Sequence, residues 1–144
     1  MNLIYTNSFT KMKQGSARYA LMLGEDGMVK DDGIICKISD QHFIATTTTG
    51  GAATVLGCME EYAQTEWPNL KVFMNSITEQ YATFNISGPK TREIMKKAFP
   101  NINFSNEEFP FMTFQFHEFN GIPIRILRAS FTGELGYEIY IPSN

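Results

Sequence analysis

Alternating apolar and polar residues recur along this chain and predict more short strands than helices. The segments predicted as strands are residues 19–23, 33–38, 42–47, 72–77, 81–87 and 136–141. Two further alternating segments, at residues 114–116 and 122–126, flank Asn120-Gly121, a dipeptide typical of β-hairpin turns. Because most of these strands are close neighbours in sequence, antiparallel pairing between them is favoured.

Two segments show the longer period of an α-helix. Val55, Met59 and Tyr62 fall on one face of a predicted helix over residues 51–66, which ends before a Trp-Pro pair. A second helix is predicted over residues 90–99, between one proline that suits a helix start and another that suits a helix stop. The predicted fold class is therefore α+β, with a mixed, mainly antiparallel sheet and two helices.

Length and charge then limit the kinds of protein to consider. With 144 residues, 43% of them hydrophobic, and no repeat or linker, we expect a single domain over residues 1–144. The formal charge of −3 argues against a nucleic acid or an anionic membrane as partner. No apolar run is long enough for a membrane span or a secretion signal, so we expect a cytoplasmic protein.

The sequence lacks the usual residues of metal and dinucleotide sites. Cys36 and Cys58 form no Cys-x-x-Cys pair, and His42 and His117 are too scattered to indicate a metal or acid–base cluster. No Gly-x-Gly-x-x-Gly follows the first strand. We therefore expect no metal, flavin or nicotinamide in this chain.

The adjacent carboxylates Asp31 and Asp32 are the first candidates for chemistry. Two carboxylates at one turn repel each other, which can prepare one of them for proton transfer. If the strand extends back to this pair, alternation places Asp32 with Ile34 and Cys36, toward apolar surroundings, and Asp31 toward water. The alternative is structural, because aspartates at turns commonly bond their own backbone.

Residues 130–138, Ser-Phe-Thr-Gly-Glu-Leu-Gly-Tyr-Glu, are the second candidate. Glu138 alternates out of phase with Tyr137 and Ile139. It lies either on a solvated face, the common case for a half-buried sheet, or opposite a core formed by Tyr137 and Ile139, where it would face a pocket.

A third candidate is the run Thr-Thr-Thr-Thr-Gly-Gly at residues 46–51, directly before the first predicted helix. Its threonines can cap that helix, or the segment can bind an anion at the helix start. It lacks the lysine of a phosphate-binding loop, and both interpretations stay open.

Taken together, several segments resemble the folate-binding aminomethyltransferase domain of the glycine-cleavage T-protein. They are residues 19–23, 26–33, 42–51, 64–68, 87–90, 109–112 and 130–138. Each alone is a weak match, but they follow the family's order and span most of the chain. Within the family, the chain is most similar to the carboxy-terminal part of sarcosine oxidase alpha subunits.

The resemblance implies a domain that binds tetrahydrofolate and passes it a one-carbon unit, giving 5,10-methylenetetrahydrofolate. In sarcosine oxidases the one-carbon donor is the imine made by amine oxidation. The family's folate site is completed by residues beyond the length of this chain, so a partial domain is implied, with further sarcosine oxidase-type subunits or a C-terminal portion as partners. The alternative is a non-catalytic module of the same fold, which binds folate or serves subunit assembly.

The resemblance also implies roles for individual residues. The active-site acid matches Asp32, the second of the pair, where a carboxylate beside the folate amines can accept a proton or stabilise an iminium cation. Glu138 matches the glutamate that hydrogen-bonds the pterin ring, and Tyr19 matches the tyrosine beside the acid. Phe131 and Cys36 stand where T-proteins have tyrosines, so those two hydroxyl contacts are not implied here.

Overall fold

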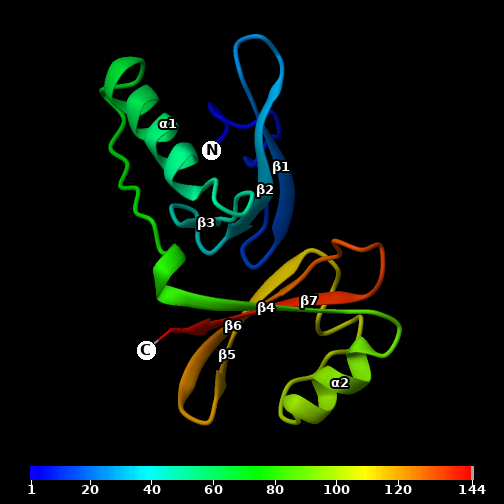
Figure 1. Ribbon diagram of the computed structural model, residues 1–144. Coiled ribbons are helices and arrows are strands. Elements are labelled where there is room, and N and C mark those ends of the chain that lie inside the picture. The colour runs from blue at the N-terminus through cyan, green and yellow to red at the C-terminus, as the bar shows by residue number, and fades with distance from the viewer. Residues whose placement is uncertain (144) are drawn as a thin grey trace. The chain divides into compact units, whose positions relative to one another are not determined.

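The computed structural model describes residues 1–143, which form two sheets and two α-helices (Figure 1). The elements in chain order are β1 Ala17–Leu23, β2 Val29–Lys37, β3 Phe43–Ala45, α1 Ala52–Thr65, a 3₁₀ turn Thr78–Gln80, β4 Tyr81–Ser87, α2 Thr91–Ala98, β5 Thr113–Phe119, β6 Ile122–Arg128 and β7 Gly136–Pro142. One sheet has the order β1-β2-β3, and the other has the order β4-β7-β6-β5. Pairing is antiparallel between β2 and β3 and throughout the second sheet, which confirms the predicted α+β class.

Contacts along the chain divide it into two compact units, each built on one of the sheets. The first unit comprises residues 1–14 and 18–78, with the three-stranded sheet and α1. The second comprises residues 15–17 and the chain from residue 79 onward, with the four-stranded sheet and α2. No Gly/Ser-rich linker marks the division, so composition gave no signal for it, and a single domain over residues 1–144 stays a prediction.

The core of the first unit lies on one face of its sheet. Ala20, Met22 and Ile35 are buried there by alternation along β1 and β2, and Val55 of α1 packs into the same cluster. The N-terminal segment contributes Tyr5, Phe9 and Met12. The opposite face of the sheet therefore carries the intervening residues of β1 and β2.

The core of the second unit is built from aromatic residues packed on β6 and β7. Phe104 and Phe109 stack with their ring centroids 5.8 Å apart, and the Tyr137 ring meets them edge-on at 5.2 and 5.5 Å. Tyr137 and Ile139 are almost fully buried in this cluster. Because residues alternate along β7, Glu138 must point to the opposite face.

The helix and hairpin predictions are confirmed by the structure. Gly51 and Glu66 cap α1, and Lys90 and Phe99 cap α2, so both helices lie within the predicted ranges. Asn120 and Gly121, at the hairpin turn, have φ angles of 51° and 79°. Positive φ at both positions is what a type I′ turn requires.

One local prediction is wrong, and one of two open interpretations is not observed. Residues 72–77 form no strand, and the Phe73 side chain is fully exposed, with a relative accessibility of 103%. Alternation there has no neighbouring strand to pair with and no core to cover. The threonines before α1 do not cap it either, because the N-cap is Gly51 and it makes no side-chain capping bond.

Gly33 lets β2 approach the segment after β3 closely. A Cβ atom at Gly33 would lie 2.0 Å from the backbone oxygen of Thr46 and 2.8 Å from its carbonyl carbon. Beside it, the Ile34 N–H donates to Thr46 Oγ1 at 2.9 Å, and the Thr46 N–H donates to the Ile34 carbonyl at 2.9 Å. No larger residue fits without moving the backbone, so Gly33 brings residues 46–48 alongside β2.

We expect Gly33→Ala to lower the free energy of unfolding by about 1–3 kcal/mol, because the new methyl group forces β2 and Thr46 apart. Gly57→Ala is the matched control, since Gly57 lies in α1 and its new methyl group would have nothing within 4 Å apart from its chain neighbours and the backbone of its own helix. That change should stabilise the chain by about 0.5–1 kcal/mol through helix propensity. Denaturant unfolding of both variants measures the difference, and an equal effect of the two would contradict the close approach.

Tyr5 is buried in the first core, and its hydroxyl has no hydrogen-bond partner among residues 1–143. Burial, followed by the negative charges of Asp31 and Cys58, raises the pKa of Tyr5 to about 12. Unfolded tyrosine loses its proton near pH 10. The stability that the raised pKa of Tyr5 contributes to the folded state is therefore fully present below about pH 10. It is lost as the pH rises toward about 12.

Tyr5→Phe should leave stability at pH 7 equal or higher, because it removes a buried hydroxyl that forms no bond. It should also reduce the loss of stability between about pH 10 and 12, because the variant lacks the tyrosine whose pKa is raised in the folded state. Melting temperatures of the two proteins across this pH range check both points. A loss of more than about 1 kcal/mol at pH 7 would show that the hydroxyl is bonded after all.

Candidate functional site

The adjacent carboxylates of β2 point to opposite faces of the first sheet. Asp31 is buried, with 7% of its surface exposed, whereas Asp32 is only partly buried. The predicted alternation is right, but the predicted burial is reversed. The reason is that the core packs on the face of Asp31 and Ile35, so Asp32 and Ile34 occupy the other face.

Tyr19 and Asp32 form a hydrogen-bonded pair across β1 and β2. The Tyr19 hydroxyl donates to Asp32 Oδ2 at 2.5 Å, a distance typical of charge-assisted bonds. This bond raises the pKa of Tyr19, and partial desolvation and the charge of Asp32 act in the same direction. Tyr19 is 51% exposed, so the pair is open to a bound molecule. The structure thus brings together two of the three predicted site residues.

Thr48 is a further residue of this cluster that the sequence did not assign. Its hydroxyl donates to Asp32 Oδ1 at 3.2 Å, and its backbone N–H donates to Asp31 Oδ1 at 3.2 Å. The run of threonines before α1 was the available signal. Helix capping and anion binding were the expected roles, but Thr48 contacts the acidic pair instead.

Glu138 lies in the second unit, on the face of β7 opposite the core. The Tyr140 hydroxyl donates to Glu138 Oε2 at 2.5 Å. Asn85 of β4 and Leu127 of β6 are its partners in register. Tyr137 and Ile139 form the core, which is compatible with both sequence interpretations of Glu138, the solvated face and the pocket. Tyr140 was missed, although a spacing of two along a strand places it on the face of Glu138.

Several aromatic rings lie near Tyr140 on this face of the second sheet. The Phe114 ring lies 6.3 Å from that of Tyr140 and 5.3 Å from that of Phe116. Arg125, the partner of Tyr140 in register, places its guanidinium carbon 4.1 Å from the centre of the Tyr81 ring. A surface of this kind can pack against a flat ring while Glu138 accepts its N–H groups.

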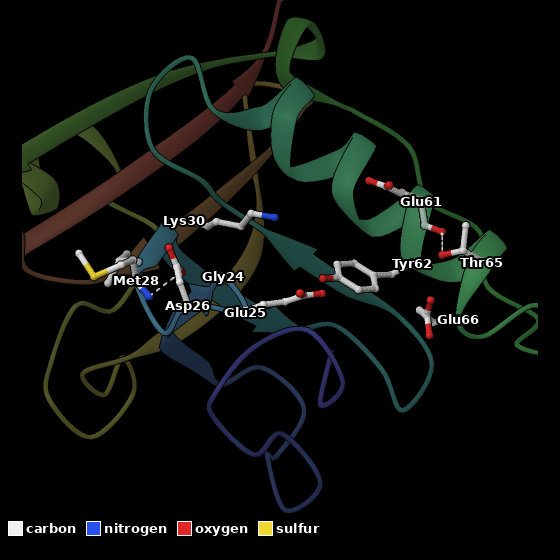
Figure 2. Close-up of a pocket in the computed structure, with 10 residues that line it drawn as sticks. Gly24, Glu25, Asp26, Met28, Lys30, Glu61, Tyr62, Thr65 and Glu66 are labelled. Carbon is white, nitrogen blue, oxygen red and sulfur yellow. Dashed lines mark hydrogen bonds between the residues drawn. The ribbon is translucent and has the colours of Figure 1, made fainter.

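A hollow of about 670 Å³ lies elsewhere in the first unit, between the β1–β2 turn and α1 (Figure 2). Its lining residues are Gly24, Glu25, Asp26, Met28, Val29, Lys30, Glu61, Tyr62, Thr65 and Glu66. Figure 2 shows Thr65 bonded to its own helix, where its hydroxyl donates to the Glu61 carbonyl at 2.9 Å. The hollow is acidic and open, and it contains none of the predicted site residues.

Among residues 1–143, no group of three or more His, Cys, Asp or Glu side chains is arranged to hold a metal ion. His117 lies 2.9 Å from Gln115 Oε1, and burial lowers its pKa. In the same part of the chain, no helix has the length and apolar character needed to cross a membrane.

Comparison with known proteins identifies relatives over the whole length of this chain. The sarcosine oxidase subunit alpha of a Corynebacterium strain is 50% identical, over 99% of this chain and 15% of the relative. An aminomethyltransferase of Oceanobacillus iheyensis is 27% identical, over 100% of this chain and 38% of the relative. The chain therefore spans only a minor part of the length of these relatives.

Comparison with solved structures gives a matching fold. The glycine cleavage system aminomethyltransferase T from Bartonella henselae superposes with a TM-score of 0.74 at 20% identity, covering 96% of this chain and 35% of that one. The family model described as the GCVT N-terminal domain matches residues 1–144. The chain therefore belongs to the GCVT N-terminal domain family.

Proposed function

We propose that this chain is the tetrahydrofolate-binding domain of a sarcosine oxidase alpha subunit-like protein, corresponding to the carboxy-terminal part of that subunit. It accepts a one-carbon unit from an amine-derived imine to form 5,10-methylenetetrahydrofolate, within a cytoplasmic oxidoreductase assembly. The observation that carries this proposal is the Tyr19–Asp32 pair, an accessible carboxylate with a fixed orientation in a chain of this family. The neighbouring subunits and the source of the imine belong to the proposal.

Asp32 acts on the reacting nitrogens. The bond that forms joins a folate nitrogen to the imine carbon, and the C=N electron pair moves to the amine nitrogen. When the second folate nitrogen closes the ring, the amine leaves, and the two protons lost by the folate nitrogens end on it. A carboxylate within reach accepts each proton in turn or stabilises the iminium cation, and this is the role that we propose for Asp32.

Glu138 recognises the pterin ring. The 2-amino-pyrimidinone edge of a pterin presents two parallel N–H donors, and a carboxylate can accept both. Tyr140 fixes one oxygen of Glu138 at 2.5 Å, which holds the plane of the carboxylate in place. The ring of Phe116, which is exposed and shares this face through its register with Arg125 and Tyr140, supplies apolar surface.

A non-catalytic module of the same fold is the alternative function. It would bind folate without transferring a one-carbon unit, or serve only subunit assembly. The two functions differ in what Asp32 does, because a module that only binds needs a pterin partner such as Glu138 but no proton acceptor.

Calorimetric titration of the chain with tetrahydrofolate tests binding. We expect Glu138→Gln to weaken binding by about 1.5–3 kcal/mol, because the amide cannot accept both pterin N–H bonds. Glu118→Gln is the matched control: Glu118 is an exposed glutamate of β5 in the same sheet, and its replacement should change nothing. Equal affinities of the two variants would reject the pterin role, and no binding by the unaltered chain would reject the proposed function.

Asp32→Asn tests catalysis. In the assembled enzyme it should slow methylene transfer by about 10²–10⁴-fold while tetrahydrofolate still binds, because the amide accepts no proton. Asp26→Asn, at an exposed turn position, removes the same charge and should leave the rate unchanged. Single-turnover rates with saturating folate make the comparison. A normal rate in Asp32→Asn would favour the non-catalytic module.

A further inference from the structure

Thr48 links the two carboxylates of β2, although their side chains point to opposite faces of the sheet. Its backbone N–H reaches Asp31 Oδ1, and its hydroxyl reaches Asp32 Oδ1, both at 3.2 Å. The two bonds leave from different atoms of one residue, so a displacement of the Thr48 backbone moves both. Thr46, two residues earlier, is already fixed to Ile34 by two bonds of 2.9 Å.

Asp31 lies on the core side of this link. Its Oδ1 lies 3.0 Å from the position that a Cβ atom would take at Gly51, so the carboxylate packs against the start of α1. Its Oδ2 is buried and has no hydrogen-bond partner among the described residues. Burying a carboxylate with so few partners costs stability. A stabilising role therefore does not explain why Asp31 is there.

We propose that Asp31 is a positioning residue, which fixes the Thr48 backbone so that the Thr48 hydroxyl holds the carboxylate of Asp32 in one orientation. This inference rests on the proposed function of Asp32 and names the residues that prepare it. Asp32 then has one hydroxyl donor on each oxygen: Thr48 at Oδ1 and Tyr19 at Oδ2. Without the Thr48 hydroxyl, the carboxylate can rotate away from Tyr19.

Tyr19 reports this orientation without any folate. The hydrogen bond to Asp32 is the largest cause of the raised pKa of Tyr19, so a loosened Asp32 brings the pKa of Tyr19 back toward its ordinary value. The ionisation of Tyr19 can be followed by NMR of the chain labelled with ¹³Cζ-tyrosine, with Tyr19→Phe to assign the signal. Asp32→Asn gives the largest change in the Tyr19 pKa that we expect, because the carboxylate itself is lost.

Thr48→Val is the central variant, since it removes the hydroxyl but keeps the backbone N–H and the side-chain volume. We expect it to increase the ionisation constant of Tyr19 by about 2- to 10-fold, where tenfold corresponds to one pH unit. Thr48→Ser restores the hydroxyl and should restore the titration. Thr49→Val is the matched control, because the bonds to the acidic pair come from Thr48 and not from that neighbouring threonine in the described part of the chain.

A double-mutant cycle tests the part of Asp31. If the charge of Asp31 acts on Tyr19 directly through space, Asp31→Asn lowers the pKa of Tyr19 independently of Thr48. The effects of Asp31→Asn and Thr48→Val on that pKa then add. If Asp31 acts through Thr48, the double variant should show no more than the larger single effect. Melting curves of all variants establish that each is folded at the pH of the measurement.

Three results would overturn the proposal. They are an unchanged Tyr19 titration in folded Thr48→Val, an equal shift of the Tyr19 pKa in Thr49→Val, and additive effects in the double-mutant cycle. Methylene transfer in the assembled enzyme gives a second measure: Thr48→Val should lower kcat at unchanged KM, and Thr48→Ser should recover it. A raised KM at unchanged kcat would place Thr48 in substrate binding and would also overturn the proposal. Calorimetry measures tetrahydrofolate binding independently of the Tyr19 titration. Failure of the proposed function is therefore distinguishable from failure of the positioning role of Asp31.

Discussion

Neighbouring residues of an extended strand point to opposite faces of the sheet, and this constraint decides where the acidic pair of β2 lies. One carboxylate must enter the core once the other is presented on the open face. Asp31 takes the buried position and Asp32 the accessible one, beside Tyr19. The same constraint acts in β7, where Tyr137 is buried and Glu138 lies on the other face. Both candidate carboxylates are therefore placed by the packing of their neighbours.

The close contact at Gly33 connects this strand with the threonines before α1. Because no side chain separates β2 from the backbone of Thr46, the next residues run alongside the acidic pair. Thr48 then reaches both carboxylates with ordinary bond lengths of 3.2 Å. Gly33, which has no reactive side chain, thus allows Thr48 to bond the carboxylate of Asp32.

The sequence predicted those features that depend on local periodicity, such as both helices and the hairpin at residues 120–121. What could not be predicted depends on partners far along the chain. The two-residue alternation of side chains along a strand predicts that Asp31 and Asp32 lie on different faces. Which of them is buried depends on the packing of α1 on one face. The hydroxyl bonds that Thr48 and Tyr140 donate to the carboxylates were not predicted either. Thr48 lies in the run at residues 46–51, whose expected roles were helix capping or anion binding, and Tyr140 was not singled out.

The hydroxyl bonds leave both carboxylates able to accept bonds from a substrate. An ionised carboxylate offers roughly four acceptor positions, two on each oxygen. Tyr19 and Thr48 occupy one on each oxygen of Asp32, so each oxygen keeps one position for an N–H group or a proton. Tyr140 occupies one position on Glu138, which leaves enough for the two parallel N–H donors of a pterin. The phenol of Tyr19 is protonated, and therefore a donor, throughout the neutral range, as any tyrosine is, and its raised pKa extends this range to higher pH. The supporting bonds thus fix the direction of each carboxylate without competing with the molecule that it is proposed to bind.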